Sequence, residues 1–248
     1  MELAELNQYL TQVLQPEKFS DYCPNGLQVE GRKEIKHIVT GVTASMALLE
    51  AANQLGADAV LVHHGYFWRG ERQQIIGLKQ RRIKFLLQHD INLFAYHLPL
   101  DAHPELGNNV MLGKLLGLPI TGYLDDKGML PFCTLEKATS LQVISDGVSE
   151  VLGRKPQTIG DMGKIARSIA WCTGAAQQYI EQAIEHNIDV FISGEISEQT
   201  VHLARESGTA YIAAGHHATE RYGIRALGEY LAGSLGLRHT FIDIDNPI

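Results

Sequence analysis

Short apolar runs alternate with helical patterns along most of this chain. Strands are predicted at residues 37–43 (HIVTGVT), 57–64 (ADAVLVHH) and 91–97 (INLFAYH). The almost continuous apolar run in 57–64 is typical of a strand that is covered on both faces. Helices are expected between these strands, at 45–56 and, with a basic amphipathic pattern, at 77–89. This alternation predicts an α/β protein with mainly parallel sheets flanked by helices.

The second half of the chain continues the same alternation. Strands are expected at residues 168–173, 189–193, 209–214 and 239–243, and helices at 139–152, 177–186, 197–206 and 218–231. Two more helices are expected at the amino terminus, ending near Pro16, and at 108–116. Residues 123–132 show no period and are interpreted as a connector.

The two halves resemble each other in sequence. IVTGVTAS and ADAVLVHHG correspond to IAWCTGAA and IDVFISGE, with an offset of 131 residues from Asp58 to Asp189. Either an internal repeat or the general similarity of short βαβ units explains this. A true repeat predicts two similar lobes, residues 1–126 and 127–248, that face each other about a pseudo-twofold axis. The last helix and strand could pack with the first lobe.

Histidines gather at the predicted strand ends. Open α/β sheets place ligands at the carboxyl ends of their strands, so these positions favour function. In two places an acidic residue follows the histidine by four positions, Asp101 after His97 and Glu220 after His216. The strand-end histidines are His63, His64, His97, His216 and His217. The alternative interpretation is a hydrogen-bonded histidine cluster without a metal.

The pair His63 and His64 favours two metal ions over one. Successive residues of a strand point to opposite faces, and only the turn allowed by Gly65 lets each imidazole serve a different ion. The hypothesis places His63 and Asp101 on one metal, His64 and His216 on the other, and Glu220 across both. Imidazole and carboxylate ligands without cysteine suit zinc, iron, manganese or nickel.

Two further residues are candidates for proton transfer. Glu195 follows a predicted strand end and could act as a general acid or base, although helix capping near Ser197 is the alternative. His97 could carry protons or orient a ligand. Because Pro99 disfavours helix at Leu98, the segment from His97 to Asp101 is expected to be a loop.

Composition limits the remaining function classes. The chain has 248 residues and a formal net charge of −7, which disfavours nucleic-acid binding through a broad basic surface. The basic cluster Lys79, Arg81, Arg82 and Lys84 is either a local nucleic-acid contact or one solvated helix face. Three unpaired cysteines, no signal-peptide core and no stretch near ~20 apolar residues favour a cytoplasmic protein without a membrane contact.

Several motifs together strongly resemble the NIF-three-like family, whose members are often called GTP cyclohydrolase 1 type 2 homologs. They are SDYCPNGLQVEG, GVTAS, ADAVLVHHGYFW, HLPLDAHPELGNN, SGEISEQT and AAGHHATER, and the match is strongest to short bacterial members of the YbgI type. The resemblance implies a dinuclear site with the five ligands named above. It also implies two α/β lobes and a toroidal homohexamer whose metal sites face an internal cavity.

The resemblance leaves the activity open. One hypothesis is a metal-dependent hydrolase of the GTP cyclohydrolase type, acting on a small-molecule substrate through a metal-bridging hydroxide. The alternative is a metal-handling or regulatory interaction protein without turnover. Where the family often has CTGGGQ, this chain has CTGAAQ, and Ala175 and Ala176 would narrow a close backbone approach to a ligand.

Overall fold

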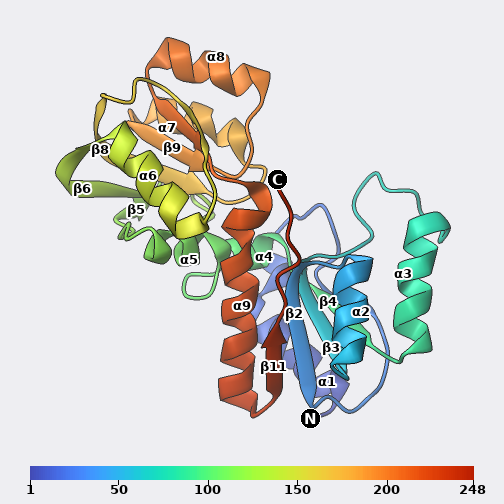
Figure 1. The fold of residues 1–248 in the computed structure, drawn as a ribbon. Coiled ribbons are helices and arrows are strands. Elements are labelled where there is room, and N and C mark those ends of the chain that lie inside the picture. The colour runs from blue at the N-terminus through green and yellow to red at the C-terminus, as the bar shows by residue number, and fades with distance from the viewer. The chain divides into compact units, whose positions relative to one another are not determined.

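The structure is a computed structural model that describes residues 1–248, and these divide into two compact units. Unit 1 comprises Met1–Asp101 and Gly223–Asp245, and unit 2 comprises Ala102–Tyr222 and Asn246–Ile248. Each unit is built on one sheet with helices packed against it (Figure 1). The lobe boundary expected after residue 126 stays a prediction, because a compact unit and a repeated lobe need not coincide. None of the helices is both long enough and apolar enough to cross a membrane.

The sheet of unit 1 has five strands in the order β1-β4-β3-β2-β11. They are β1 (Gly26–Val29), β2 (His37–Thr43), β3 (Ala59–His64), β4 (Asn92–Ala95) and β11 (Arg238–Phe241). All neighbours are parallel except the pair β1 and β4. The helices are α1 (Leu3–Leu14), the 3-10 turn η1 (Pro16–Lys18), α2 (Met46–Gln54), α3 (Gly77–Gln88), α4 (Leu98–Asp101) and the second part of α9 (His216–Leu235).

Alternating side chains of these strands build the core of unit 1. Val39, Val60 and Val62 project onto one face, where Leu48 of α2 and Leu86 of α3 cover them. Helix α1 lies behind the strands in Figure 1, and the second part of α9 runs beside β11. Because both faces are covered, the strands carry the nearly continuous apolar runs that predicted them.

The sheet of unit 2 has six strands in the order β5-β6-β8-β9-β10-β7. They are β5 (Gly122–Tyr123), β6 (Pro131–Ser140), β7 (Gln157–Ile159), β8 (Ile165–Cys172), β9 (Val190–Ser193) and β10 (Ala210–Ala213). Only β8, β9 and β10 are parallel, so this sheet is mixed and its antiparallel strands lie at both sides. The helices are α5 (Asn108–Leu115), α6 (Leu141–Leu152), η2 (Gln177–Tyr179), α7 (Ile180–Glu185), α8 (Glu198–Ser207) and the first part of α9.

Two layers of helices enclose the second sheet. Trp171 and Ile192 point towards Leu112 of α5 and the buried face of α6. Their strand neighbours point the other way, and Phe191 packs with Ile180 of α7. This alternation places helices on both faces, as the sequence predicted for an α/β protein.

Both units contain the same β-α-β-α-β core, formed by β2 to β4 and by β8 to β10. In unit 1 the Asp58 carboxylate accepts hydrogen bonds from the backbone N–H groups of Lys36 and His37 at the start of β2. In unit 2 the Asp189 carboxylate does the same for Arg167 and Ser168 in β8. The repeated segments therefore share this pattern of carboxylate-to-backbone hydrogen bonds as well as a sequence pattern.

Some predicted elements differ from the structure. The segment after His97 was expected to be a loop, but Leu98–Asp101 forms the short helix α4. Proline is tolerated in the first helical turn because no N–H donor is required there. The N–H groups of Leu100 and Asp101 both reach the carbonyl of His97, at 2.9 and 3.1 Å.

Four strands were not predicted, namely β1, β5, β6 and β7. Strand β1 begins at Gly26 in a segment for which no element was expected, the expected connector at 123–132 is bounded by β5 and β6, and β7 follows the predicted helix at 139–152. Strand β6 pairs on one side with the two-residue strand β5, and most of its side chains are partly or fully exposed. It therefore lacks a strong apolar run. Helix α9 begins at His216, two residues before the predicted start at 218.

Candidate metal centre

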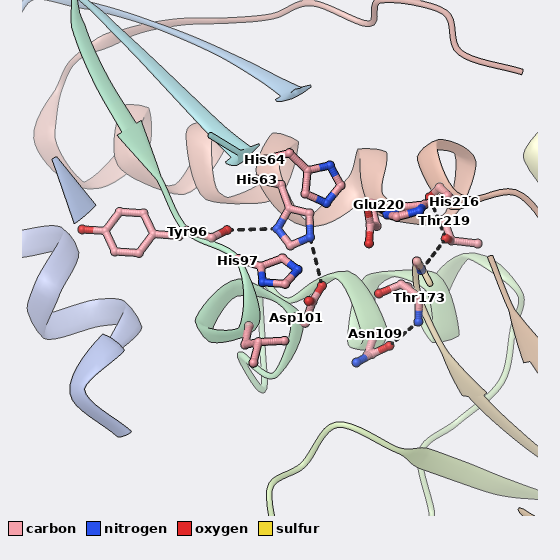
Figure 2. Close-up of polar contacts among 12 residues, drawn as sticks. His63, His64, Tyr96, His97, Asp101, Asn109, Thr173, His216, Thr219 and Glu220 are labelled. Atoms are coloured by element: carbon pink, nitrogen blue, oxygen red, sulfur yellow. Dashed lines mark hydrogen bonds and ion pairs between the residues drawn. The ribbon is translucent and has the colours of Figure 1, made fainter. Parts of the chain in front are cut away.

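His63 is the penultimate residue of strand β3 and is fully buried, and its two ring nitrogens have different partners. Its Nδ1 lies 2.9 Å from the carbonyl oxygen of Tyr96, and its Nε2 lies 3.5 Å from Oδ1 of Asp101 (Figure 2). A carbonyl oxygen can only accept, so Nδ1 donates its hydrogen to Tyr96. With the ring neutral, Nε2 turns a lone pair towards a carboxylate, and these two acceptors need a proton or a metal ion between them; with the ring protonated, the same contact is an ion pair.

His64 and His97 lie beside His63 at the same end of the sheet. The ring centroid of His63 is 4.5 Å from that of His64 and 5.1 Å from that of His97. One nitrogen of each of the three rings lies within 4.8 Å of the others. The structure therefore brings His63, His64, His97 and Asp101 together in unit 1, as the strand-end pattern led us to expect.

The turn after the histidine pair is held by strand β1. The side-chain amide of Gln28 accepts a hydrogen bond from the Tyr66 N–H at 2.7 Å and donates one to the Tyr66 carbonyl at 3.1 Å. A Cβ on Gly65 would lie 2.3 Å from Oε1 of Gln28, so only glycine allows this approach. Gly65 of the HHG motif thus allows Gln28 to pack against the turn, in addition to letting the chain change direction there.

In unit 2, the side chain of His216 lies between two carboxylates. Its Nδ1 donates to Oε1 of Glu195 at 2.7 Å, and its Nε2 lies 3.1 Å from Oε2 of Glu220, one turn along α9. Burial opposes a charge on the ring, but the hydrogen bonds and charges of Glu220 and Glu195 outweigh it and raise the pKa of His216 to about 9. The metal-free ring is thus protonated at neutral pH, and an ion bound at Nε2 must displace that proton.

The Glu220 carboxylate fits against the loop that follows β8. Gly174 adopts φ +70°, and a Cβ at this position would lie 2.0 Å from Oε1 of Glu220. The N–H of Gly174 donates to the hydroxyl of Thr219, and the preceding N–H, of Thr173, donates to the side chain of Asn109 (Figure 2). The loop is thus fixed on both sides, and the missing side chain of Gly174 leaves room for the carboxylate.

Ala175 and Ala176, which stand where the family often has glycine, directly follow Gly174 in this loop. Ala175 is exposed, whereas Ala176 is buried in the core beside α7. Neither needs a positive φ, so both tolerate a side chain. The close approach in this loop is made at Gly174, which this chain retains.

Two residues that sequence reasoning left aside belong to the surroundings of this centre. Oδ1 of Asp21 lies 2.7 Å from Nδ1 of His97, and Oδ1 of Asn25 accepts the backbone N–H of His97 at 2.7 Å. Both come from the DYCPNG segment, which carries no helix or strand period. Its presence among the family motifs was the only sequence feature that pointed to it.

Cys23 lies between Asp21 and Asn25 but is unsuited to act as a thiolate. Burial and the nearby negative charge of Asp21 raise the pKa of its thiol to about 12. The three cysteines are buried and unpaired by disulfides. This agrees with a candidate ligand set of imidazoles and carboxylates.

The basic cluster of α3 is partly engaged within its own unit. Lys79 forms an ion pair with Glu71 at 3.4 Å and lies 4.7 Å from the ring centroid of Phe67. Arg82 lies over the ring of Tyr66, at 6.0 Å. These contacts favour the interpretation of the cluster as a helix face over that of a nucleic-acid contact.

The fold and these side chains define an α/β protein with candidate metal ligands at the carboxyl ends of its parallel strands. The sequence matches the Duf34/NIF3 (NGG1p interacting factor 3) family over residues 1–247. The chain therefore belongs to this family.

Relatives and solved structures resemble the chain over its whole length. A Pseudomonas aeruginosa protein described as a GTP cyclohydrolase 1 type 2 homolog is 52% identical, over 99% of this chain and 98% of the relative. The solved structure of protein ybgI, described as of unknown function, is 51% identical with a TM-score of 0.96, over 100% of both chains. TTHA1606 from Thermus thermophilus is 33% identical with a TM-score of 0.91, also over 100% of both chains.

Proposed function

We propose that this chain binds two divalent metal ions and is a metal-dependent hydrolase. His63 and Asp101 would hold one ion, His64 and His216 the other, and Glu220 would contact both. Zinc, iron, manganese and nickel fit this set of nitrogen and oxygen donors. The single observation that carries the proposal is the buried contact in unit 1 in which Nε2 of His63 faces the Asp101 carboxylate at 3.5 Å.

The donor residues of unit 2 support the same proposal. His216 and Glu220 share one face of α9, and Gly174 leaves space at the Glu220 carboxylate. The chain passes between the units directly after Asp101 and again two residues after Glu220. Both carboxylates thus lie next to the points where the backbone crosses from one unit to the other.

Bound divalent ions would supply Lewis acidity, which promotes the attack of water on an electrophilic centre. The residues of this chain would orient the ligands and move protons. The Tyr96 carbonyl fixes the tautomer of His63, and Glu195 fixes the ring of His216. Glu195, with a side chain that is 34% exposed, and His97 are the proposed proton carriers.

The experiment compares the wild-type protein with Glu220→Ala. Metal content is measured after mild purification, and turnover is measured with GTP, the substrate in the printed name of the relatives. We expect about two ions per chain and GTP hydrolysis in the wild type, and loss of both in the variant. Glu229→Ala is the matched control, since Glu229 lies on the same helix, is 57% exposed and pairs with Arg225 on the surface.

The outcomes separate the two candidate functions. Two ions without turnover in either protein would support metal handling or a regulatory interaction instead of hydrolysis. Less than one ion per chain, with no binding on reconstitution, would contradict the metal centre itself. Equal losses in Glu220→Ala and Glu229→Ala would show that the effect is not specific to the site.

We also propose that the chain assembles into a toroidal homohexamer. The proposal is supported by membership of the Duf34/NIF3 family and by the resemblance of the sequence motifs to those of its short bacterial members. Unit 1 also exposes apolar side chains just before and within α3, namely Ile75, Ile76 and Leu78, which are 51%, 58% and 62% exposed. Apolar groups of this kind are suited to a contact between subunits.

A further inference from the structure

The Asp21 carboxylate is the centre of a hydrogen-bond network that encloses His97. It accepts from the N–H groups of Tyr22 at 2.6 Å and Leu98 at 2.9 Å, and from the side-chain amide of Asn25 at 2.9 Å. Nδ1 of His97 lies 2.7 Å from its Oδ1. The Asp21 side chain is only 3% exposed, so water contributes little to these bonds.

This network determines which nitrogen of His97 carries the hydrogen. Burial alone would raise the pKa of Asp21, but the hydrogen bonds from His97, Asn25 and Leu98 lower it to about 2. The carboxylate is therefore ionised and can only accept. Nδ1 of His97 must then donate, and the neutral ring has its lone pair on Nε2.

The position of the ring is fixed as well as its tautomer. The backbone N–H of His97 donates to Oδ1 of Asn25 at 2.7 Å, and the edge of the ring meets Trp68 with centroids 5.0 Å apart. The centroids of His63 and His64 lie 5.1 and 5.8 Å from that of His97 (Figure 2). Since Asp21 occupies Nδ1, Nε2 is the nitrogen left for the centre at His63 and His64.

We propose that Asp21 is a positioning residue that holds His97 with Nε2 as a proton acceptor in the candidate centre. The inference rests on the proposed function and extends it to a residue outside the five proposed ligands. A water molecule or a substrate hydroxyl would transfer its proton to Nε2, while the Nδ1 hydrogen stays in its bond to Asp21. The resulting imidazolium is stabilised by the carboxylate and returns the proton to the leaving group.

The test measures the tautomer of His97 directly by ¹⁵N NMR of the imidazole nitrogens in the chelator-treated, metal-free protein. Spectra are recorded at alkaline pH, where neutral rings are observed, and His97→Gln assigns the resonances. We expect a protonated Nδ1 and a non-protonated Nε2 in the wild type. In Asp21→Ala no acceptor holds the hydrogen on Nδ1, so part of the non-protonated signal should move from Nε2 to Nδ1.

Asn25→Ala is the matched control, because it removes the backbone anchor of His97 and leaves the Asp21 carboxylate in place. We expect the wild-type tautomer in this variant. A wild-type ring with a hydrogen on Nε2, an unchanged tautomer in Asp21→Ala, or the same change in both variants would overturn the proposal. Each result is an NMR measurement that does not depend on turnover, so a failure of the protein to hydrolyse GTP does not alter it.

Zn²⁺ added to the metal-free protein separates a proton acceptor from a metal ligand. We expect Zn²⁺ to shift the ligand nitrogens of His63 and His64 strongly and Nε2 of His97 only weakly. An equally strong shift at His97 would make this ring a ligand and overturn its assignment as a proton acceptor. Absence of all three shifts, in contrast, would contradict the metal centre and leave the tautomer result intact.

Discussion

Gly174 illustrates how one missing side chain can support a site. Its φ of +70° and its contact with Glu220 both depend on the absence of a Cβ. In Gly174→Ala the new methyl group must displace the Glu220 carboxylate, whose Oε1 would lie only 2.0 Å away. We expect a loss of metal affinity of roughly 10–100-fold, the range found when groups that orient a ligand are changed. Isothermal titration with Zn²⁺ measures it.

Gly153→Ala is the control for the backbone strain of that substitution. Gly153 has nearly the same φ, +68°, and nothing lies within 4 Å of its missing Cβ. Both variants should lose about 1–2 kcal/mol of stability from the left-handed backbone. Metal affinity should fall only in Gly174→Ala, and an equal fall in both would remove the steric explanation.

At the residue scale, the sequence pointed to the histidines and acidic residues of the candidate site but not to the residues that orient them. His63, His64 and His97 come together because parallel strands end at the same edge, which the alternation of elements implies. Asp21 lies 76 positions before His97 in the chain, in a segment without a period. Hydrogen bonds over such a separation leave no local pattern, so the sequence could not reveal them.

At the element scale, Asp189 links β8 to the start of β9. Its carboxylate accepts from the N–H groups of Arg167 and Ser168. Burial raises its pKa, but these hydrogen bonds outweigh that effect and lower it below the usual value of about 3.9. A carboxyl group whose pKa is lowered on folding stabilises the native state above about pH 4, and this contribution is lost as the pH falls through its folded value.

We therefore expect Asp189→Asn to reduce the free energy of unfolding at pH 7 and to have a smaller effect at pH 3. Urea unfolding at the two pH values measures the difference from the wild type. Asp245→Asn is the control, because Asp245 is exposed and should show no such pH dependence. A loss for Asp189→Asn that is the same at both pH values would contradict the linkage.

Helices and strands with a clear periodicity of apolar residues were predicted closely, whereas elements with a weak pattern were not. The expected strand 37–43 coincides with β2, and the helix expected at 45–56 is α2, capped by the Ser45 side chain. Strands β1, β5, β6 and β7 were missed because the edge strands β1, β5 and β7 are short and β6 shows little apolar alternation. Helix α4 was missed because a rule against helix before proline was outweighed by two bonds to the His97 carbonyl.

At the scale of the whole molecule, the proposed hexamer makes a direct prediction. Size-exclusion chromatography with light scattering should give a mass of six times the 27.4 kDa chain. The mass should stay constant on dilution if the ring is closed, because every subunit of a closed ring has all its contacts satisfied. A monomer or dimer at micromolar concentration would contradict the proposal.

The α/β class and the histidines at the strand ends could be predicted from the sequence alone, whereas the similarity of its two halves left an internal repeat open. These follow from local periodicity, which depends on whether each face of an element is buried. Three features became visible only in the folded chain: the second sheet is mixed, β11 returns to pair with β2, and Asp21 holds His97. Such contacts join distant segments, and they are selected by packing and hydrogen-bond geometry in three dimensions, which no window of the sequence contains.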